Sequence, residues 1–264
     1  MQKTILITND DGINSPGIKA AVEAVSDLGR VVVVAPAEQQ TSAGRSLKGS
    51  KEEKLIPFEF EVNNKTVEAY SCNSTPALAV CHGINVLFSE KLPDLVISGI
   101  NYGENLGSNI TISGTVGAAL EAASYGIPAI AASLQTEMEF HHKYGEVNWE
   151  GAKHFLRKFC EALLKNKLPA DVDILKIDVP AEADESTEWK ITKVSKQPYF
   201  VAYQDEPSLS STIGDAKLKI EFNDNVLEED SDIRTIFYDK KVSVCPVSID
   251  MSSRIKEKEL SGIL

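Results

Sequence analysis

The order of apolar and polar positions along the chain predicts buried strands that alternate with amphipathic helices. Residues 4–8 and 31–35 are short, β-branched apolar runs, the pattern of strands covered on both faces. Between them, Ser15 and Pro16 suit a helix cap and a first helical turn, and apolar residues then recur at helical spacing until Gly29. The chain therefore begins β-α-β, a unit whose right-handed crossover brings both strand ends to one edge of the sheet.

Helices and strands continue to about residue 180, although the pattern changes from about residue 136. Charged, weakly alternating residues over 48–70 are more typical of a hairpin or edge strands than of core. Elsewhere, apolar runs predict strands over 95–97, 129–133 and 174–179, and helical spacing predicts helices that begin near Thr75, Thr115 and Trp149. These elements predict an α/β fold with a Rossmann-like, mostly parallel sheet and helices on both faces.

The pattern changes beyond residue 185. Weak alternation predicts hairpins, a polar and acidic stretch covers 204–232, an apolar run predicts a returning strand over 242–247, and the last dozen residues form a tail. We therefore divide the chain into a Rossmann-like catalytic domain, 1–185, and a C-terminal extension, 186–264. We expect this β-hairpin and helix appendage to pack against a neighbouring subunit.

Charge and composition narrow the classes of partner. The formal charge is −12, with 27 Lys and Arg against 39 Asp and Glu, which argues against binding to nucleic acid polymers. The N-terminus enters a strand without a basic and then a long apolar segment, and no run approaches the length of a membrane helix. The four cysteines show no CxxC spacing. We therefore expect a cytoplasmic protein with reduced cysteines and no membrane partner.

The first predicted strand ends in Asn9, Asp10, Asp11 and Gly12, a group that suits a divalent cation. Neighbouring side chains of a strand point to opposite faces, so both acids reach one cation only if the chain turns, as Gly12 permits. Carboxylate and amide oxygens favour Mg²⁺ or Mn²⁺ over zinc. The alternative is a turn that only caps the next helix. The histidines lack HExxH spacing and are expected at the surface or in packing: His82, His141, His142 and His154.

Three later loops offer partners for this acidic turn. Asn101 follows the strand at 95–97 and suits either a turn or a neutral oxygen ligand. Thr41 or Ser42, after the second strand, offers a hydroxyl. Residues 113–115 read Ser-Gly-Thr at a helix start, where free N–H groups favour an anion, although simple capping is the alternative. Neither a P-loop nor a GxGxxG dinucleotide motif is present.

Together these groups favour the hydrolysis of phosphate monoesters. A hard cation among them can bind a phosphoryl oxygen, offset the acids and generate a nucleophile from water. Two alternatives stay open at this point. A covalent aspartyl phosphatase of the haloacid dehalogenase type also uses an acid pair, although usually with one residue between the acids. A non-enzymatic, receiver-like Mg²⁺-binding module needs an acid at the third strand end, where this chain has Ser98 and Asn101.

Several stretches of the chain closely resemble the SurE family of survival-protein nucleotidases. The likeness is dense over residues 4–133, and weaker matches follow at 175–180 and 243–247. The residues that carry it are 7–18, 34–36, 93–107 and 113–119. It implies a metal-dependent phosphatase that acts on nucleoside 5′- or 3′-monophosphates, a 5′-nucleotidase or acid-phosphatase type of hydrolase. It also implies one Mg²⁺ or Mn²⁺ per subunit and a homodimer or homotetramer joined through the C-terminal part.

The resemblance assigns roles to individual residues. Asp10, Asp11 and Asn101 match the family's metal ligands, and Asn105 with Ser113, Gly114 and Thr115 matches its phosphate-contacting loop. The fourth ligand is usually serine followed by glycine; alignment without a gap puts Thr41 there and Ser42 in the glycine's place. Ile112 stands where the family commonly has tyrosine. We expect Asp10, Asp11 and Asn9 to act in catalysis, with Asn9 and Asn105 orienting the phosphoryl oxygens.

Overall fold

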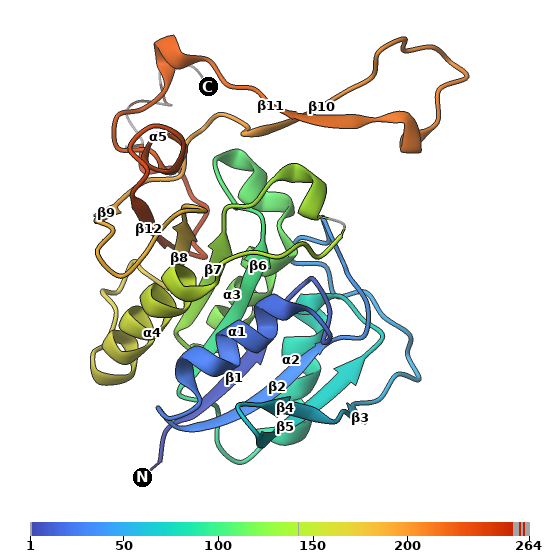
Figure 1. Cartoon of the computed structure of the whole chain (residues 1–264), viewed down its shortest axis with the longest axis vertical. Coiled ribbons are helices and arrows are strands. Elements are labelled where there is room, and N and C mark those ends of the chain that lie inside the picture. Colours follow the sequence, from blue (N-terminus) through green and yellow to red (C-terminus); the bar gives the residue numbers. More distant parts are fainter. Residues whose placement is uncertain (1, 142, 256–258, 260, 262–264) are drawn as a thin grey trace.

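The computed structural model describes residues 2–141, 143–255, 259 and 261, and it confirms the predicted α/β fold (Figure 1). A ten-stranded sheet contains, in spatial order, β3, β5, β2, β1, β6, β7, β8, β12 and β9, with β4 paired to β5. The strands from β5 to β8 in this order are parallel. They are β1 Thr4–Thr8, β2 Arg30–Pro36, β5 Lys65–Cys72, β6 Leu95–Tyr102, β7 Ala129–Leu134 and β8 Ile174–Val179.

Helices cover both faces of this sheet. The apolar side chains of α1 and α4 pack into one core cluster, and those of α2 and α3 pack into a second cluster on the other face. The bounds are α1 Pro16–Val25, α2 Pro76–Leu87, α3 Gly114–Ser124 and α4 Glu150–Lys165, with short 3₁₀ turns η1 Ser108–Ile112 and η2 Met138–His141. Because parallel strands run one way, their polar C-terminal ends gather at one edge between the two helix layers.

The C-terminal part of the chain divides between the main sheet and a separate arm. β12 (Val242–Val247) lies between β8 and β9 (Trp189–Ile191), antiparallel to β8. The remaining strands, β10 (Phe200–Tyr203) and β11 (Lys217–Ile220), form their own two-stranded sheet in an arm that projects from the body (Figure 1). η3 (Ile213–Asp215) comes directly before β11, and η4 (Asp224–Val226) and α5 (Asp232–Phe237) follow it. The division at residue 185 stays a prediction.

Local details correct three expectations. Helix α1 ends at Val25, and Gly29 instead allows a close backbone approach, because a Cβ there would lie 2.4 Å from the Lys3 carbonyl oxygen. Within 48–70, β3 (Ile56–Pro57) and β4 (Phe60–Val62) pair antiparallel with β5, but β5 is a strand of the parallel sheet and Phe60 is buried in the core. Strand β6 continues to Tyr102, so Asn101 lies within it.

Some predictions fall wholly or partly on residues outside the described part. These are His142 and most of the tail over 253–264. Among the described residues, none of the helices has the length and apolar character to cross a membrane. The four cysteines are free thiols.

The start of α1 is tied to the end of β1 through one hydroxyl. Ser15 Oγ accepts a hydrogen bond from the Ile18 amide at 3.2 Å, which caps the helix, and a second from Asn9 Nδ2 at 2.8 Å. Ser15 is fully buried, so water cannot replace either bond. The cap predicted from Ser15 and Pro16 is therefore confirmed, and it also anchors the turn that carries the acid pair.

We predict that Ser15→Ala lowers the free energy of unfolding by about 1–2 kcal/mol, because a cap and the acceptor of a buried amide are both lost. At roughly 2–4 °C per kcal/mol the melting temperature should fall by several degrees. Thermal unfolding followed by circular dichroism measures the change. Ser26→Ala, at the exposed C-terminal end of the same helix, is the matched control and should melt as the wild type does. Equal melting of all three proteins would contradict the prediction.

Candidate metal and phosphate site

A cavity of about 300 Å³ opens at the C-terminal edge of the parallel strands, and it unites most of the predicted site residues. They come from different elements: the acids follow β1, the hydroxyls follow β2, Asn101 lies near the end of β6, and Ser113 caps α3. The cavity is lined, among others, by Asp10, Asp11, Thr41, Ser42, Asn101, Asn105 and Ser113. Residues separated by up to about a hundred positions therefore meet because parallel strands end at one edge.

Asp10 is packed against the first turn of α3. It is 7% exposed, and the Thr115 hydroxyl donates to its Oδ1 at 2.5 Å. Gly114 makes this approach possible, because a Cβ there would lie 2.7 Å from Asp10 Oδ2. The three residues predicted at the helix start therefore have different surroundings. Ser113 lines the cavity, whereas Gly114 and Thr115 are buried against Asp10. The helix start stabilises the Asp10 carboxylate with its N–H groups and its dipole.

Asp11 is held from two sides and is only 4% exposed. Its Oδ2 accepts from the Tyr102 amide at 3.1 Å, and its Oδ1 accepts from Gln39 Nε2 at 3.3 Å. Burial, together with the neighbouring charge of Asp10, raises the pKa of Asp11 to about 8, and burial also raises the pKa of Asp10. A buried acid pair with this tendency to hold protons is a site that a cation stabilises in the ionised form.

Asn101 reaches the cavity through a bulge in β6. Pairing with β7 shifts register between Ser98 and Asn101, so that β6 carries one extra residue there. Gly99 lies in the bulge with a φ of 128° and with no room for a Cβ beside the Ala132 carbonyl. Both amide hydrogens of Asn101 point to backbone carbonyls, those of Tyr102 at 3.2 Å and Gly103 at 2.7 Å. Its Oδ1 is thus the atom oriented to serve as a ligand.

Thr41 and Ser42 are exposed at the rim of the same cavity. Ser42 has a φ of 60°, the left-handed conformation that glycine adopts most readily. That geometry fits the alignment which places Thr41 at the ligand position and Ser42 where glycine usually follows. The loop that carries both residues is attached to α3 a few positions later, where Arg45 Nε donates to the buried Glu121 carboxylate at 2.8 Å.

The two asparagines expected to orient phosphoryl oxygens occupy different environments. Asn9 is buried outside the cavity lining, and its Nδ2 donates to the Gly12 carbonyl at 3.0 Å and to Ser15 Oγ. It therefore holds the turn that presents Asp10 and Asp11, and its role in catalysis stays a prediction. Asn105 lines the cavity, with its Nδ2 bonded to Ser133 Oγ at 2.8 Å.

Several lining residues were missed by the sequence analysis. Gln39 connects Asp11 to the His141 carbonyl oxygen, which it reaches at 2.8 Å. An apolar wall comes from the arm, through Phe200 and Ala202 of β10 and Leu218 of β11, with Ile112 of η1 beside it. No local pattern marks these arm residues, because they lie far along the chain from the acids and from Asn101. Gly99 inside an apolar run was a usable signal of the bulge.

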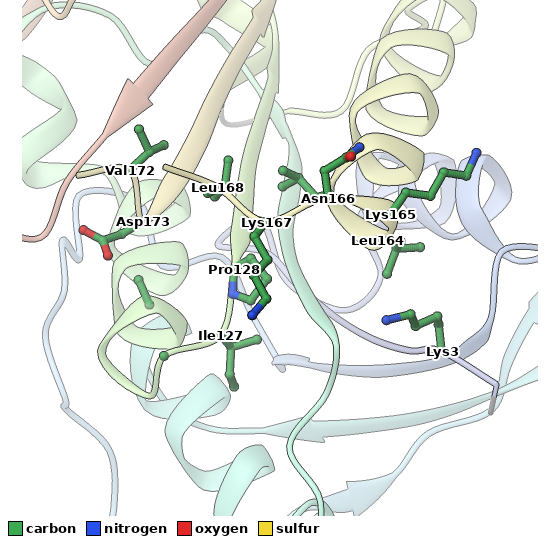
Figure 2. A pocket seen from close by; sticks show the side chains of 13 residues that line it. Lys3, Ile127, Pro128, Leu164, Lys165, Asn166, Lys167, Leu168, Val172 and Asp173 are labelled. Atoms are coloured by element: carbon green, nitrogen blue, oxygen red, sulfur yellow. The ribbon is translucent and has the colours of Figure 1, made fainter. Parts of the chain in front are cut away.

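The volume of a pocket does not by itself identify the functional site. A larger pocket of about 490 Å³ lies at the opposite edge, where β1, β7 and β8 begin (Figure 2). Figure 2 shows the lysines Lys3, Lys165 and Lys167 among its side chains, and Asp173 is the one carboxylate among the described residues that line it. That pocket offers no set of oxygen ligands for a divalent cation.

The donor set of the first cavity fits a hard divalent cation. Two carboxylates, an amide oxygen and a hydroxyl are the ligands that Mg²⁺ and Mn²⁺ prefer, whereas zinc favours imidazole and thiolate. Within the described residues no three His, Cys, Asp or Glu side chains gather as a metal cluster, so the neutral oxygens have to complete the set. A cation at this place would also offset the charge of the two buried acids.

Comparisons with known proteins agree with the resemblance. The family model described as survival protein SurE matches residues 5–200. The 5′-nucleotidase SurE of Methanothrix thermoacetophila is 37% identical over 272 residues, covering 99% of this chain and 98% of that protein. The 5′-nucleotidase SurE of Thermococcus gammatolerans is 37% identical over 266 residues, covering 98% and 95%. The crystal structure of the SurE protein from Aquifex aeolicus superimposes with a TM-score of 0.77 at 31% identity, covering 98% and 99%.

The conformation of Ser42 generates a prediction that also separates the two candidate hydroxyl ligands. Ser42→Gly should raise the free energy of unfolding by up to about 1 kcal/mol, because a left-handed backbone strains any residue with a Cβ. If Thr41 is the ligand, the affinity for Mn²⁺ should stay within about twofold, whereas Thr41→Ala should weaken it. Chemical denaturation and calorimetric Mn²⁺ titration measure both effects. Ser46→Gly is the control, and it should lower the free energy of unfolding because Ser46 does not have the left-handed conformation. A loss of Mn²⁺ affinity in Ser42→Gly would instead identify Ser42 as the ligand.

Proposed function

The chain belongs to the SurE family, and from this membership we propose that it is a nucleotidase, a divalent-metal-dependent phosphomonoesterase that hydrolyses nucleoside 5′- or 3′-monophosphates. The observation that carries the proposal is the single cavity in which the acid pair, Asn101, Thr41 and Ser113 face one space. Hydroxyl and amide donors suited to phosphate lie beside oxygen ligands suited to a cation, and a phosphate monoester is the substrate that needs both.

The residues divide into a metal-holding group and a phosphate-holding group. Asp10, Asp11, Thr41 and Asn101 would hold one Mg²⁺ or Mn²⁺, which supplies Lewis-acid stabilisation of phosphoryl charge and lowers the pKa of water. Ser113 Oγ accepts from the Val116 amide at 3.1 Å, so its own hydrogen can be donated to a phosphoryl oxygen. Such donors, fixed in place before the substrate arrives, favour the more highly charged transition state.

The apolar wall supports a nucleotide as substrate. Phe200 and Leu218 line the same cavity as the acids, and an aromatic ring with an aliphatic neighbour suits the face of a nucleobase. A sugar alone would leave this surface exposed to water. The receiver-like alternative finds no support here, since β6 carries Ser98 and Asn101 where that mechanism needs an acid.

We predict that EDTA abolishes phosphate release from nucleoside 5′- and 3′-monophosphates and that Mn²⁺ or Mg²⁺ restores it. Asp10→Asn should lower kcat by several orders of magnitude, because a weakened metal site loses the Lewis acid and the nucleophile together. The measurement is a phosphate-release assay. Asp27→Asn, an exposed carboxylate paired with Arg157, is the matched control and should be unaffected. Activity that survives EDTA and Asp10→Asn would contradict the metal mechanism, and a beryllium fluoride adduct on either aspartate would favour the covalent one.

The proposal extends to assembly in the cytoplasm as a homodimer or homotetramer through the arm. The arm carries large apolar side chains that the single chain leaves in water, among them Leu209 and Ile213, both almost fully exposed. Exposed apolar surface of this kind marks interaction sites. Four free cysteines suit a reducing compartment.

We predict that Leu209→Ser combined with Ile213→Ser shifts the protein toward the monomer, because both side chains would lose apolar contact with the partner. Size-exclusion chromatography with light scattering, over a range of concentrations, measures the mass. Val226→Ser removes another exposed apolar side chain outside the β10–β11 strands and should leave the assembly unchanged. A wild type that is monomeric at high concentration would overturn the proposal.

A further inference from the structure

A fully buried ion triad lies beneath the loop that carries Asn105. Lys176 of β8 is inaccessible to water, and its ammonium has an acceptor for each of its three hydrogens. These are the Asn105 carbonyl oxygen at 2.8 Å, Asp178 Oδ2, and Asp232 Oδ2 at 3.1 Å. Both aspartates are equally buried. The proposed metal ligands do not take part in this cluster, so it has a different task.

The two carboxylates bind the backbone of the same loop. Asp178 Oδ1 accepts from the Asn105 amide at 2.7 Å, and Asp232 Oδ2 accepts from the Gly107 amide at 3.1 Å. With the bond from Lys176, three backbone groups of residues 105–107 are held by three charged side chains. Bonds of this kind are shorter and stronger than neutral ones, and no water competes for them here.

The triad joins parts of the chain that are remote in sequence. Asp232 begins α5, and its Oδ1 also accepts from the Ser195 amide at 3.0 Å. Nearby, Asn109 Oδ1 accepts from the amides of Tyr199 and Phe200 at 2.6 and 2.9 Å. The loop is thus enclosed between β8 on one side and the C-terminal segment, residues 195–237, on the other.

We propose that Lys176 and Asp232 are positioning residues that make the phosphate-binding geometry of Asn105 depend on the docking of the C-terminal segment. Separating Asp232 from Lys176 would expose or isolate a charge in a dry interior, which is far more costly than breaking a neutral contact. The loop and the segment therefore hold their places together. The substrate part of this inference rests on the proposed nucleotidase function; the coupling of loop and segment does not.

The experiment compares Asp232→Asn with Asp230→Asn. The first substitution keeps the shape of the side chain but removes its charge, so that Lys176 keeps Asp178 as its one charged partner and the Asn105 carbonyl oxygen as an acceptor. The control changes the same residue type two positions away, where Asp230 forms an exposed pair with Lys193 at 2.6 Å. Each full-length protein is loaded with Mn²⁺ and assayed for KM and kcat on a nucleoside monophosphate, for Mn²⁺ affinity, and for hydrogen exchange of the amides at 103–109.

For Asp232→Asn we expect KM to rise about tenfold and kcat/KM to fall by roughly 10- to 100-fold, because displacing a substrate-binding group by about 1 Å has effects of this size. Mn²⁺ affinity should stay within about twofold, since the metal ligands are untouched. The Asn105 and Gly107 amides should exchange at least about tenfold faster. Asp230→Asn should match the wild type in every measurement. If Asp232→Asn fails to fold, Asp178→Asn, which leaves the Lys176 and Asp232 charges balanced, is read by the same criteria.

Unchanged KM together with unchanged amide exchange would overturn the inference. A loss of Mn²⁺ affinity as large as the loss of substrate affinity would overturn it too, because it would reveal general destabilisation instead of positioning. A wild type that turns over no nucleotide contradicts the proposed function alone. In that case the exchange rates, together with calorimetric binding of inorganic phosphate to the Mn²⁺ protein, decide the inference.

Discussion

The withdrawal of two adjacent carboxylates from water is the constraint on which the rest of the structure depends. Burying even one such charge is costly unless donors or a cation surround it. Asp10 is met by the start of α3, and Asp11 by the backbone of β6 and by Gln39. The turn that presents them is fixed from behind by Asn9 and Ser15. These donors all act on the same two carboxylates, yet burial still leaves the pKa of both acids raised.

Much of this arrangement could be predicted from the sequence, because its signals are local. The β-branched runs, the cap at Ser15 and the acid pair before Gly12 each follow from short-range rules, and parallel topology then brings the strand ends together. The position of Asn101 within β6 could not be inferred from periodicity, since an extra residue in a strand changes register without changing composition. The choice of Thr41 over Ser42 came from the family resemblance, and the left-handed backbone of Ser42 is consistent with it.

What escaped prediction are contacts between segments far apart in the chain. Lys176 occurs in an apolar run where a lysine is ordinarily placed at a surface, and nothing near it in sequence reveals that Asp232 is its partner. Phe200 and Leu218 are likewise unremarkable in a polar region, yet they form the apolar wall of the cavity. Tertiary packing decides the environment of such residues, and a single sequence carries no record of it. The cavity is therefore a joint product of the parallel sheet and of the chain that follows it.

The place of β12 in the sheet has a consequence for the order in which the molecule is assembled during synthesis. Among the described residues β12 is the last strand along the chain, but it lies inside the sheet, between β8 and β9. A ribosome-bound chain that ends before residue 242 already contains the acid pair, β6 and α3, but β8 has no neighbour on its outer side and β9 has nothing to pair with. Because chains begin to fold as they emerge, the edge that carries the acid pair can form before β12 completes this side of the sheet. An incomplete chain would thus carry the acid pair and its neighbouring strands while β8 still has an unpaired edge.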